Sequence, residues 1–231
     1  MKYKTLLFDA DMTLFDFKAS EAQCLKQTLE EYGFPHNEQT LALYSRINDS
    51  YWKRFEHGEI SRSALLTARF DDFFRELGAN GNSAEFNRRY LENMGESSLL
   101  LEGAEELCRE LCKTHRLYII TNGNSKNQRR RFEKSGFDRY FLDYFISEEI
   151  GCQKPQTAFF DYVREHIPDW DADSTLVIGD SLSSDIQGAI NYNLDCCWLN
   201  PDKLNYTLNQ TCTYEIYRLE QLKSILFEKQ F

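Results

Sequence analysis

The sequence predicts an α/β fold, a mostly parallel sheet with an inserted all-helical cap. Short apolar runs alternate with amphipathic helical patterns along residues 1–15 and 97–231. That alternation favours right-handed β–α–β crossovers and a sheet covered on both faces. Residues 16–96 read as one helix after another, without a good strand. We therefore expect an α/β core (residues 1–15 and 97–231) and a helical cap (residues 16–96).

Five apolar runs are expected to form the strands of the core. The first is halted by acidic residues, as is typical of a buried parallel strand. The runs are residues 5–8, 117–120, 144–146, 175–178 and 194–199. Their alternation with helices predicts a Rossmann-like core.

Helical patterns separate these strands. In the second pattern, Ser125 and Gln128 have the spacing of a capping box, and Gly136 is the expected stop. Pro155 is expected at the first position of the third helix. The four patterns are residues 102–115, 125–135, 157–167 and 183–193.

Four helices are expected in the cap, each beginning at a polar residue and ending at a glycine. Trp52 and Phe55 are three positions apart, and we expect them on the buried side of a helix rather than against a substrate. The helices are residues 20–32, 37–57, 61–77 and 83–94.

Composition excludes several classes of protein. Of the 231 residues, 42% are hydrophobic and 14% aromatic, enough for a sizeable core. The net charge of 27 − 37 = −10 disfavours binding to a nucleic-acid polymer. Seven cysteines, an odd number, suggest reduced core thiols rather than a disulfide framework. The N-terminus resembles no signal peptide, no membrane span is expected, and we predict a cytoplasmic protein.

Four aspartates follow two of the predicted strands. Asp9 and Asp11 come directly after residues 5–8, and Asp180 and Asp185 follow residues 175–178. Any one of them alone fits a turn or a helix cap. If the strands are neighbours, Asp9, Asp11 and Asp180 converge at one edge of the sheet, where carboxylates require a cation. Oxygen ligands alone favour a hard cation, and Mg²⁺ is the expected cofactor.

Two further segments offer groups suited to phosphate. Thr121 and Asn122 end a predicted strand with a hydroxyl and an amide, and the flexible Gly123 follows them. Lys154 precedes a predicted helix and supplies a point charge. In contrast, the run from Arg129 to Arg131 is expected on a solvated face of its helix.

Taken in order, these segments resemble the four motifs of the haloacid dehalogenase-like (HAD) hydrolase superfamily. The resemblance extends over nearly the whole chain. It rests on Asp9-Ala10-Asp11-Met12-Thr13, Ile120-Thr121-Asn122-Gly123, Gln153-Lys154-Pro155 and Gly179-Asp180-Ser181-Leu182-Ser183-Ser184-Asp185.

The resemblance implies a role for each matching position. Asp9 corresponds to a nucleophile that forms an aspartyl-phosphate, and Asp11 to the general acid and base. Thr121 and Lys154 correspond to the phosphate-holding residues. The implied metal ligands are one oxygen of Asp9, the backbone carbonyl of Asp11, and Asp180. Asp185 corresponds to an acidic position that acts on the metal indirectly or through water.

The residues around the four motifs narrow the resemblance to one subfamily. With the late stretch Cys197-Trp198-Leu199-Asn200-Pro201, they look like the bacterial pyrimidine 5′-nucleotidase subfamily. Asp11 favours phosphate esters, since the dehalogenases of this pattern lack that aspartate. Met12 departs from the glycine or small or polar residue that many HAD phosphatases carry there.

The resemblance implies a small phosphorylated metabolite, most simply a nucleotide, as the partner. Two alternatives stay open. One is a capped sugar-phosphate phosphatase or phosphomutase. The other is not an enzyme but a signalling receiver that accepts a phosphoryl group on aspartate; an insert of about 80 residues (16–96) is hard to explain there.

Overall fold

The computed structural model describes residues 2–205 and 212–227. The chain divides into two compact units, Met1–Asp16 with Leu99–Phe231, and Phe17–Ser98. In the first unit, the two chain segments that flank the insert are joined by backbone hydrogen bonds. There the Asp16 N–H donates to the Leu99 carbonyl at 3.0 Å, and Leu101 donates to the Leu14 carbonyl at 2.9 Å. Within the described residues, none of the helices combines the length and the apolar character that crossing a membrane requires.

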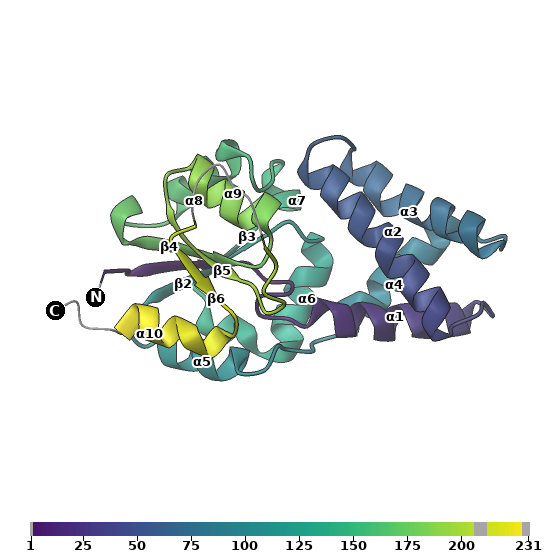
Figure 1. Cartoon of the computed structure of the whole chain (residues 1–231), viewed down its shortest axis with the longest axis horizontal. Helices are drawn as coiled ribbons and strands as arrows, with labels where there is room; N and C mark the ends of the chain where they lie inside the picture. Colours follow the sequence, from purple (N-terminus) through teal and green to yellow (C-terminus); the bar gives the residue numbers. More distant parts are fainter. Residues whose placement is uncertain (1, 206–211, 228–231) are drawn as a thin grey trace. The chain divides into compact units, whose positions relative to one another are not determined.

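The first unit contains a six-stranded parallel sheet in the order β3-β2-β1-β4-β5-β6 (Figure 1). The order reverses between β1 and β4, and in such sheets ligands bind at the carboxyl ends of the strands beside this point. The strands are β1 (Thr5–Phe8), β2 (Arg116–Thr121), β3 (Asp143–Ile146), β4 (Thr175–Gly179), β5 (Asp195–Leu199) and β6 (Tyr214–Ile216).

Alternate residues of the strands build two apolar clusters, one on each face of the sheet. On β1, Leu6 and Phe8 belong to one cluster and Leu7 to the other, and all three are 0% exposed. Each such side chain contributes about 1.5–3 kcal/mol by its burial. The first face is covered by α5 (Ala104–Leu111), α6 (Ser125–Ser135) and α10 (Leu222–Phe227), and the second by α8 (Thr157–His166) and α9 (Gln187–Asn191) (Figure 1).

The second unit is a four-helix domain with an aromatic core of its own. Tyr44 stacks on Phe70 with ring centroids 5.1 Å apart, and both side chains are fully buried. Phe55 is buried and Trp52 is half-buried against it, with centroids 5.8 Å apart. The pair therefore packs within the domain, as we expected. The helices are α1 (Phe17–Glu31), α2 (Glu38–Glu56), α3 (Arg62–Leu77) and α4 (Ser83–Glu96).

Several sequence-based details are wrong. Asn124, not a Ser125/Gln128 capping box, caps α6, because its side chain accepts from the Asn127 N–H. Pro155 is not the first helical residue, because α8 begins at Thr157, as the helical pattern itself predicted. The predicted helix over residues 183–193 is a π-helical turn, Leu182–Ile186, followed by the short α9. The elements not predicted are β6, α7 (Ser147–Ile150), α10 and three 3₁₀ turns at Phe137–Tyr140, Ala172–Ser174 and Leu219–Gln221.

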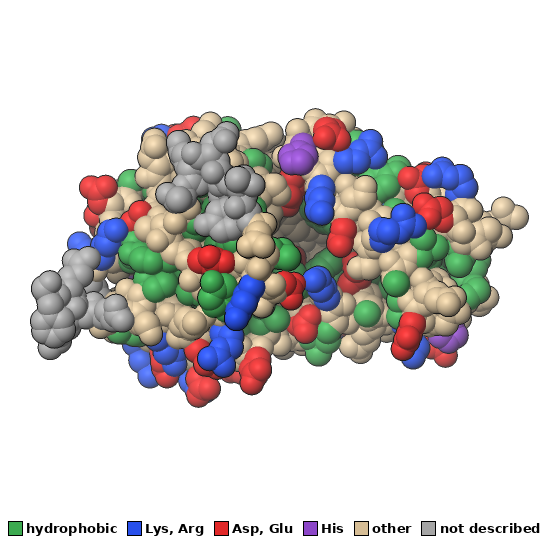
Figure 2. Space-filling view, viewed as in Figure 1, with side chains coloured by type: hydrophobic (Ala, Val, Ile, Leu, Met, Phe, Trp, Pro, Cys, Tyr) green, Lys and Arg blue, Asp and Glu red, His purple; other side chains and the backbone are tan. Residues whose placement is uncertain are grey.

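The cysteines and the surface charges complete the description. All seven thiols are free, as expected, but only Cys24, Cys108, Cys196 and Cys197 are buried. Acidic and basic side chains are interspersed over the face seen in Figure 2. The described residues include many exposed ion pairs, such as Arg129 with Glu149 at 2.6 Å.

Candidate active site

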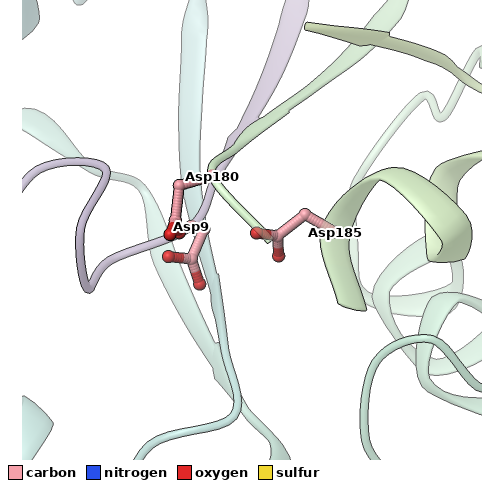
Figure 3. Close-up of side chains that lie close together, drawn as sticks. All are labelled: Asp9, Asp180 and Asp185. Carbon is pink, nitrogen blue, oxygen red and sulfur yellow. The ribbon is translucent and has the colours of Figure 1, made fainter. Parts of the chain in front are cut away.

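Three aspartates meet at the carboxyl edge of the sheet. Asp9 follows β1, Asp180 follows β4, and Asp185 lies in the π-helical turn beyond it (Figure 3). The backbone brings the first two together, since the Asp9 N–H donates to the carbonyl of Ile178 at 2.8 Å. One carboxylate oxygen from each aspartate lies within 4.8 Å of the others. We expected Asp9, Asp11 and Asp180 to converge. Asp9 and Asp180 do so, but the third carboxylate of the cluster is Asp185 and not Asp11.

A buried lysine lies between two of these carboxylates. The Nζ of Lys154 is 2.7 Å from Oδ1 of Asp9 and 2.5 Å from Oδ1 of Asp185. It also donates to the Ile120 carbonyl at 2.7 Å, and its side chain is only 1% exposed. Burial lowers the pKa of Lys154, but the charges of Asp185 and Asp9 outweigh that effect and raise it. Lys154 therefore remains a cation within the cluster.

One ammonium group does not balance three carboxylates. Burial, followed by the charge of Asp185, raises the pKa of Asp9 to about 8. Burial, followed by the charges of Asp9 and Asp185, raises the pKa of Asp180 well above its usual value. Carboxylates in this arrangement are ionised together only when a further cation is present.

Gly179 makes room for Asp185. A Cβ at this position would lie 2.2 Å from Oδ2 of Asp185, which no side chain tolerates. The same Oδ2 accepts the Ser181 N–H at 3.1 Å. Asp185 is thus held at both oxygens, by Lys154 and by the backbone after β4.

Thr121 is the last residue of β2, and Asn122 follows it beside the cluster. Thr121 is 2% exposed, and its Oγ1 accepts the Gly123 N–H at 3.1 Å. The Asn122 amide grips the backbone of Lys154, since its Oδ1 accepts the Lys154 N–H at 3.0 Å and its Nδ2 donates to the Lys154 carbonyl at 2.9 Å. These contacts of Asn122 fix the segment that carries the lysine.

Asp11 lies outside the three-aspartate cluster and has different neighbours. Its Oδ1 accepts from Nη1 of Arg131 at 2.5 Å, and its Oδ2 accepts from Nε2 of Gln128 at 2.6 Å. The next residue, Met12, has φ 61°, in the left-handed region where glycine is unstrained. The turn that presents Asp11 therefore carries backbone strain at Met12.

Two neighbours of Asp11 differ from what the sequence predicted: Gln128 was expected only as part of a capping box, and Arg131 on a solvated face. Arg129 is exposed and paired with Glu149, as expected of a solvated face, but Arg131 is 2% exposed and faces Asp11. Their spacing in the sequence could have predicted that they act together, because Gln128 and Arg131 are three residues apart and so share one face of α6.

Comparison with known proteins identifies the family. A family model described as haloacid dehalogenase-like hydrolase matches residues 6–199. The chain belongs to this family. Among the relatives of this HAD-like hydrolase, YfnB of Bacillus subtilis is 40% identical over 97% of this chain and 96% of its own. The pyrimidine 5′-nucleotidases PynA of Streptococcus pneumoniae and YjjG of Escherichia coli are 36% and 31% identical, each over 98% of this chain and over 96% and 99% of their own.

A solved structure supports the same assignment. The crystal structure of B. subtilis YfnB bound to magnesium has a TM-score of 0.95 at 39% identity, over 99% of this chain and 100% of that one. The HAD family predicted from the four motifs is confirmed, and so is the Rossmann-like α/β class. The roles of individual residues are taken up below.

Proposed function

We propose that this HAD-like hydrolase is a Mg²⁺-dependent phosphohydrolase that acts on small phosphomonoesters. The observation that carries the proposal is the meeting of Asp9, Asp180 and Asp185 at the switch point of the sheet, with the buried Lys154 paired to Asp9 and Asp185. Paired charges of this kind position and neutralise a phosphoryl group during its transfer.

The proposed reaction has two steps. An oxygen of Asp9 attacks phosphorus, so that an Asp–O–P bond forms while the bond to the ester oxygen breaks. Asp11 gives a proton to the leaving oxygen and then takes one from the water that hydrolyses the aspartyl-phosphate. The hydroxyl of Thr121 and the Nζ of Lys154 are assigned to the phosphate oxygens. Asn122, which the sequence grouped with them, is assigned an indirect role, because both N–H groups of its amide are engaged with Lys154 and Ser184 and its oxygen holds the Lys154 N–H.

The donor set fits magnesium. It consists of oxygens, and three carboxylates outnumber the one ammonium group by two charges, 3 − 1 = 2. An oxygen of Asp9, the Asp11 carbonyl and Asp180 would hold the ion, with Asp185 acting indirectly or through water. Bound Mg²⁺ would neutralise the phosphoryl oxygens. The magnesium bound in the 39% identical YfnB structure supports the choice of ion.

Within this reaction class, a pyrimidine nucleoside 5′-monophosphate is the proposed substrate. The support is that two relatives at 36% and 31% identity are named pyrimidine 5′-nucleotidases. A net charge of −10 agrees with a small metabolite rather than a nucleic-acid polymer, and we propose a cytoplasmic location. The alternatives on this scaffold are a sugar-phosphate phosphatase or a phosphomutase.

The test is phosphate release by wild type and by Asp9→Asn. Wild type should release phosphate from p-nitrophenyl phosphate only with Mg²⁺, and Asp9→Asn should lose that activity while its circular dichroism stays unchanged. The matched control, Asp202→Asn, changes an exposed aspartate beyond β5 and should keep full activity. A panel of dUMP, other nucleotides and hexose phosphates separates the substrates. Turnover retained by Asp9→Asn, or a stable phosphoprotein without phosphate release, would refute the proposal.

A further inference from the structure

Asp11 is held at both of its carboxylate oxygens by a single helix. Arg131 binds Oδ1 and Gln128 binds Oδ2, at 2.5 and 2.6 Å. The two residues are also linked, because Nη1 of Arg131 lies 3.3 Å from Oε1 of Gln128. A carboxylate held at two points keeps one orientation, whereas the Asp11 side chain, 27% exposed, would otherwise rotate about its own bonds.

We infer that Gln128 and Arg131 are positioning residues that orient the Asp11 carboxylate for proton transfer to and from the substrate oxygen. The inference rests on the proposed function. Neither residue is assigned to the phosphate, the metal or the reacting atoms. Arg131 is expected to act only through Asp11, since proton transfer demands a close approach in a fixed direction. Gln128 is expected to act through Asp11 and also touches the hydroxyl of Thr121.

The surroundings of Arg131 argue against a purely structural role. Its side chain is 2% exposed, yet Nε and Nη2 have no hydrogen-bond partner among the described residues. The guanidinium carbon lies 4.5 Å from the ring centroid of Phe15, which packs against it without accepting a hydrogen bond. Within the described part of the chain, Asp11 is its one ion-pair partner. A buried arginine with unsatisfied nitrogens is costly for stability, which fits a task at Asp11 better than a stabilising one.

The side chain of Gln128 occupies the space left by the missing Cβ of Gly123, the glycine that follows Thr121 and Asn122. A Cβ on Gly123 would lie 2.3 Å from Nε2 and 2.7 Å from Cγ of Gln128. The same Nε2 is 3.2 Å from Oγ1 of Thr121. The glycine after Thr121 and Asn122 therefore admits the amide that reaches Asp11, which links this motif to the acid/base group.

The helix itself is well anchored for this purpose. Asn124 caps its first turn, and Gly136 ends it with φ 66°. Phe132, next to Arg131, is 1% exposed and packs edge-on against Phe15 with ring centroids 5.2 Å apart. Side chains on a fixed helix hold a partner with more precision than side chains on a loop.

The test compares Arg131→Met with Arg129→Met on the same helix. Arg129 pairs with Glu149 and does not contact Asp11, so its replacement controls for loss of a charge on α6. The measured quantity is kcat/KM for dUMP and for p-nitrophenyl phosphate. The sugar oxygen of dUMP needs a proton to leave, whereas p-nitrophenolate leaves without one. Arg131→Met should lower kcat/KM about 100-fold with dUMP and far less with p-nitrophenyl phosphate, and Arg129→Met should change neither.

Three more variants make the inference independent of folding defects in Arg131→Met. Gln128→Met removes the second donor at similar volume, and Gly123→Ala displaces it without removing a polar group. Both should lower kcat/KM more with dUMP than with p-nitrophenyl phosphate, on top of a loss common to both substrates through the contact with Thr121. Arg131→Lys keeps the charge and should restore part of the loss. In an Asp11→Asn background, Arg131→Met should cause no further decrease.

The possible failures are distinguishable. Equal losses with both substrates, or a full further loss in the Asp11→Asn background, would overturn the positioning role while leaving the phosphohydrolase intact. A wild-type protein that releases no phosphate from any phosphomonoester would remove the proposed function itself.

Discussion

At the scale of single residues, activity is expected to depend on Gly179, because this glycine leaves the space that Asp185 occupies. A Cβ there would meet Oδ2 of Asp185 at 2.2 Å and push it from Lys154 and from the Ser181 N–H. We expect Gly179→Ala to lower kcat/KM, and the affinity for Mg²⁺, by about 10- to 100-fold, the range typical of residues that support metal ligands. Phosphate release over a Mg²⁺ titration measures both.

A second glycine provides the control for this prediction. Gly33 has φ +71° but nothing within 4 Å of a built Cβ, so Gly33→Ala strains the backbone without displacing a neighbour. It should keep full activity despite some loss of stability. Activity of Gly179→Ala equal to wild type would show that Asp185 can move without consequence.

Some site residues could be predicted from the sequence and others could not. Asp9, Asp180 and Lys154 were found because each follows or precedes a recognisable element, and parallel strands bring their carboxyl ends to one edge. Arg131 was not found, because a run of three arginines is typical of a charged surface. Its partner, Asp11, is 120 positions away in sequence, so only tertiary packing reveals the pair.

At the scale of elements, clear hydrophobic patterns in the sequence were sufficient to predict the bounds of a strand or helix, whereas short or weakly patterned segments were not. The predicted strand over residues 5–8 and helix over 125–135 have the bounds of β1 and α6. In contrast, β6 is a three-residue edge strand, too short to show a pattern. The capping-box prediction failed because the Gln128 side chain is engaged with Asp11 instead of the helix terminus.

The helical cap offers a prediction on pH, because α1 carries a buried carboxyl. Glu21, 4% exposed, accepts from Nδ2 of Asn48 at 2.6 Å, and Asn48 in turn accepts from Arg69 at 2.7 Å. Burial, reinforced by the charge of Asp49 and opposed by hydrogen bonds and by Arg69, raises the pKa of Glu21 to about 7. The folded state therefore holds this proton more tightly than the unfolded chain.

The sign of the effect follows from this raised pKa. The stabilisation is complete below the unfolded value near 4.5 and is lost as the pH rises through about 7. From pH 5 to pH 8, wild type should lose about 2–3 kcal/mol of unfolding free energy relative to Glu21→Gln. Urea unfolding at the two pH values measures the difference. Glu30→Gln, an exposed change on the same helix, should behave as wild type, and parallel pH profiles for wild type and Glu21→Gln would contradict the prediction.

At the scale of the whole molecule, the two units have separate apolar cores. Both clusters on the sheet consist of residues before position 17 or after position 98. The cluster of the helical unit lies entirely between these positions. Asp9, Asp11, Lys154 and Asp180 all belong to the first unit. The described apolar clusters on the sheet therefore contain no residue of the insert. The aspartates and the lysine of the candidate site also come from the first unit alone.

This separation predicts that the core folds when the insert is removed. Phe15 and Leu100 form an antiparallel bridge, and Asp16 donates to the Leu99 carbonyl at 3.0 Å, so the chain ends left by deleting residues 17–98 face each other like the strands of a hairpin. A two-residue Asn-Gly turn between Asp16 and Leu99 should close the gap. The shortened protein should unfold cooperatively and release phosphate from p-nitrophenyl phosphate with Mg²⁺. Its preference among nucleotides and sugar phosphates should weaken, because the core alone retains only the groups assigned to the phosphate and the metal.

Circular dichroism, thermal unfolding and the substrate panel measure these outcomes for the shortened protein. The same deletion carrying Asp9→Asn should be folded and inactive, which separates the contribution of the site from that of the scaffold. An unfolded or aggregated product would show that the sheet requires the helical unit for its stability. Full selectivity in the shortened protein would instead assign substrate choice to the core.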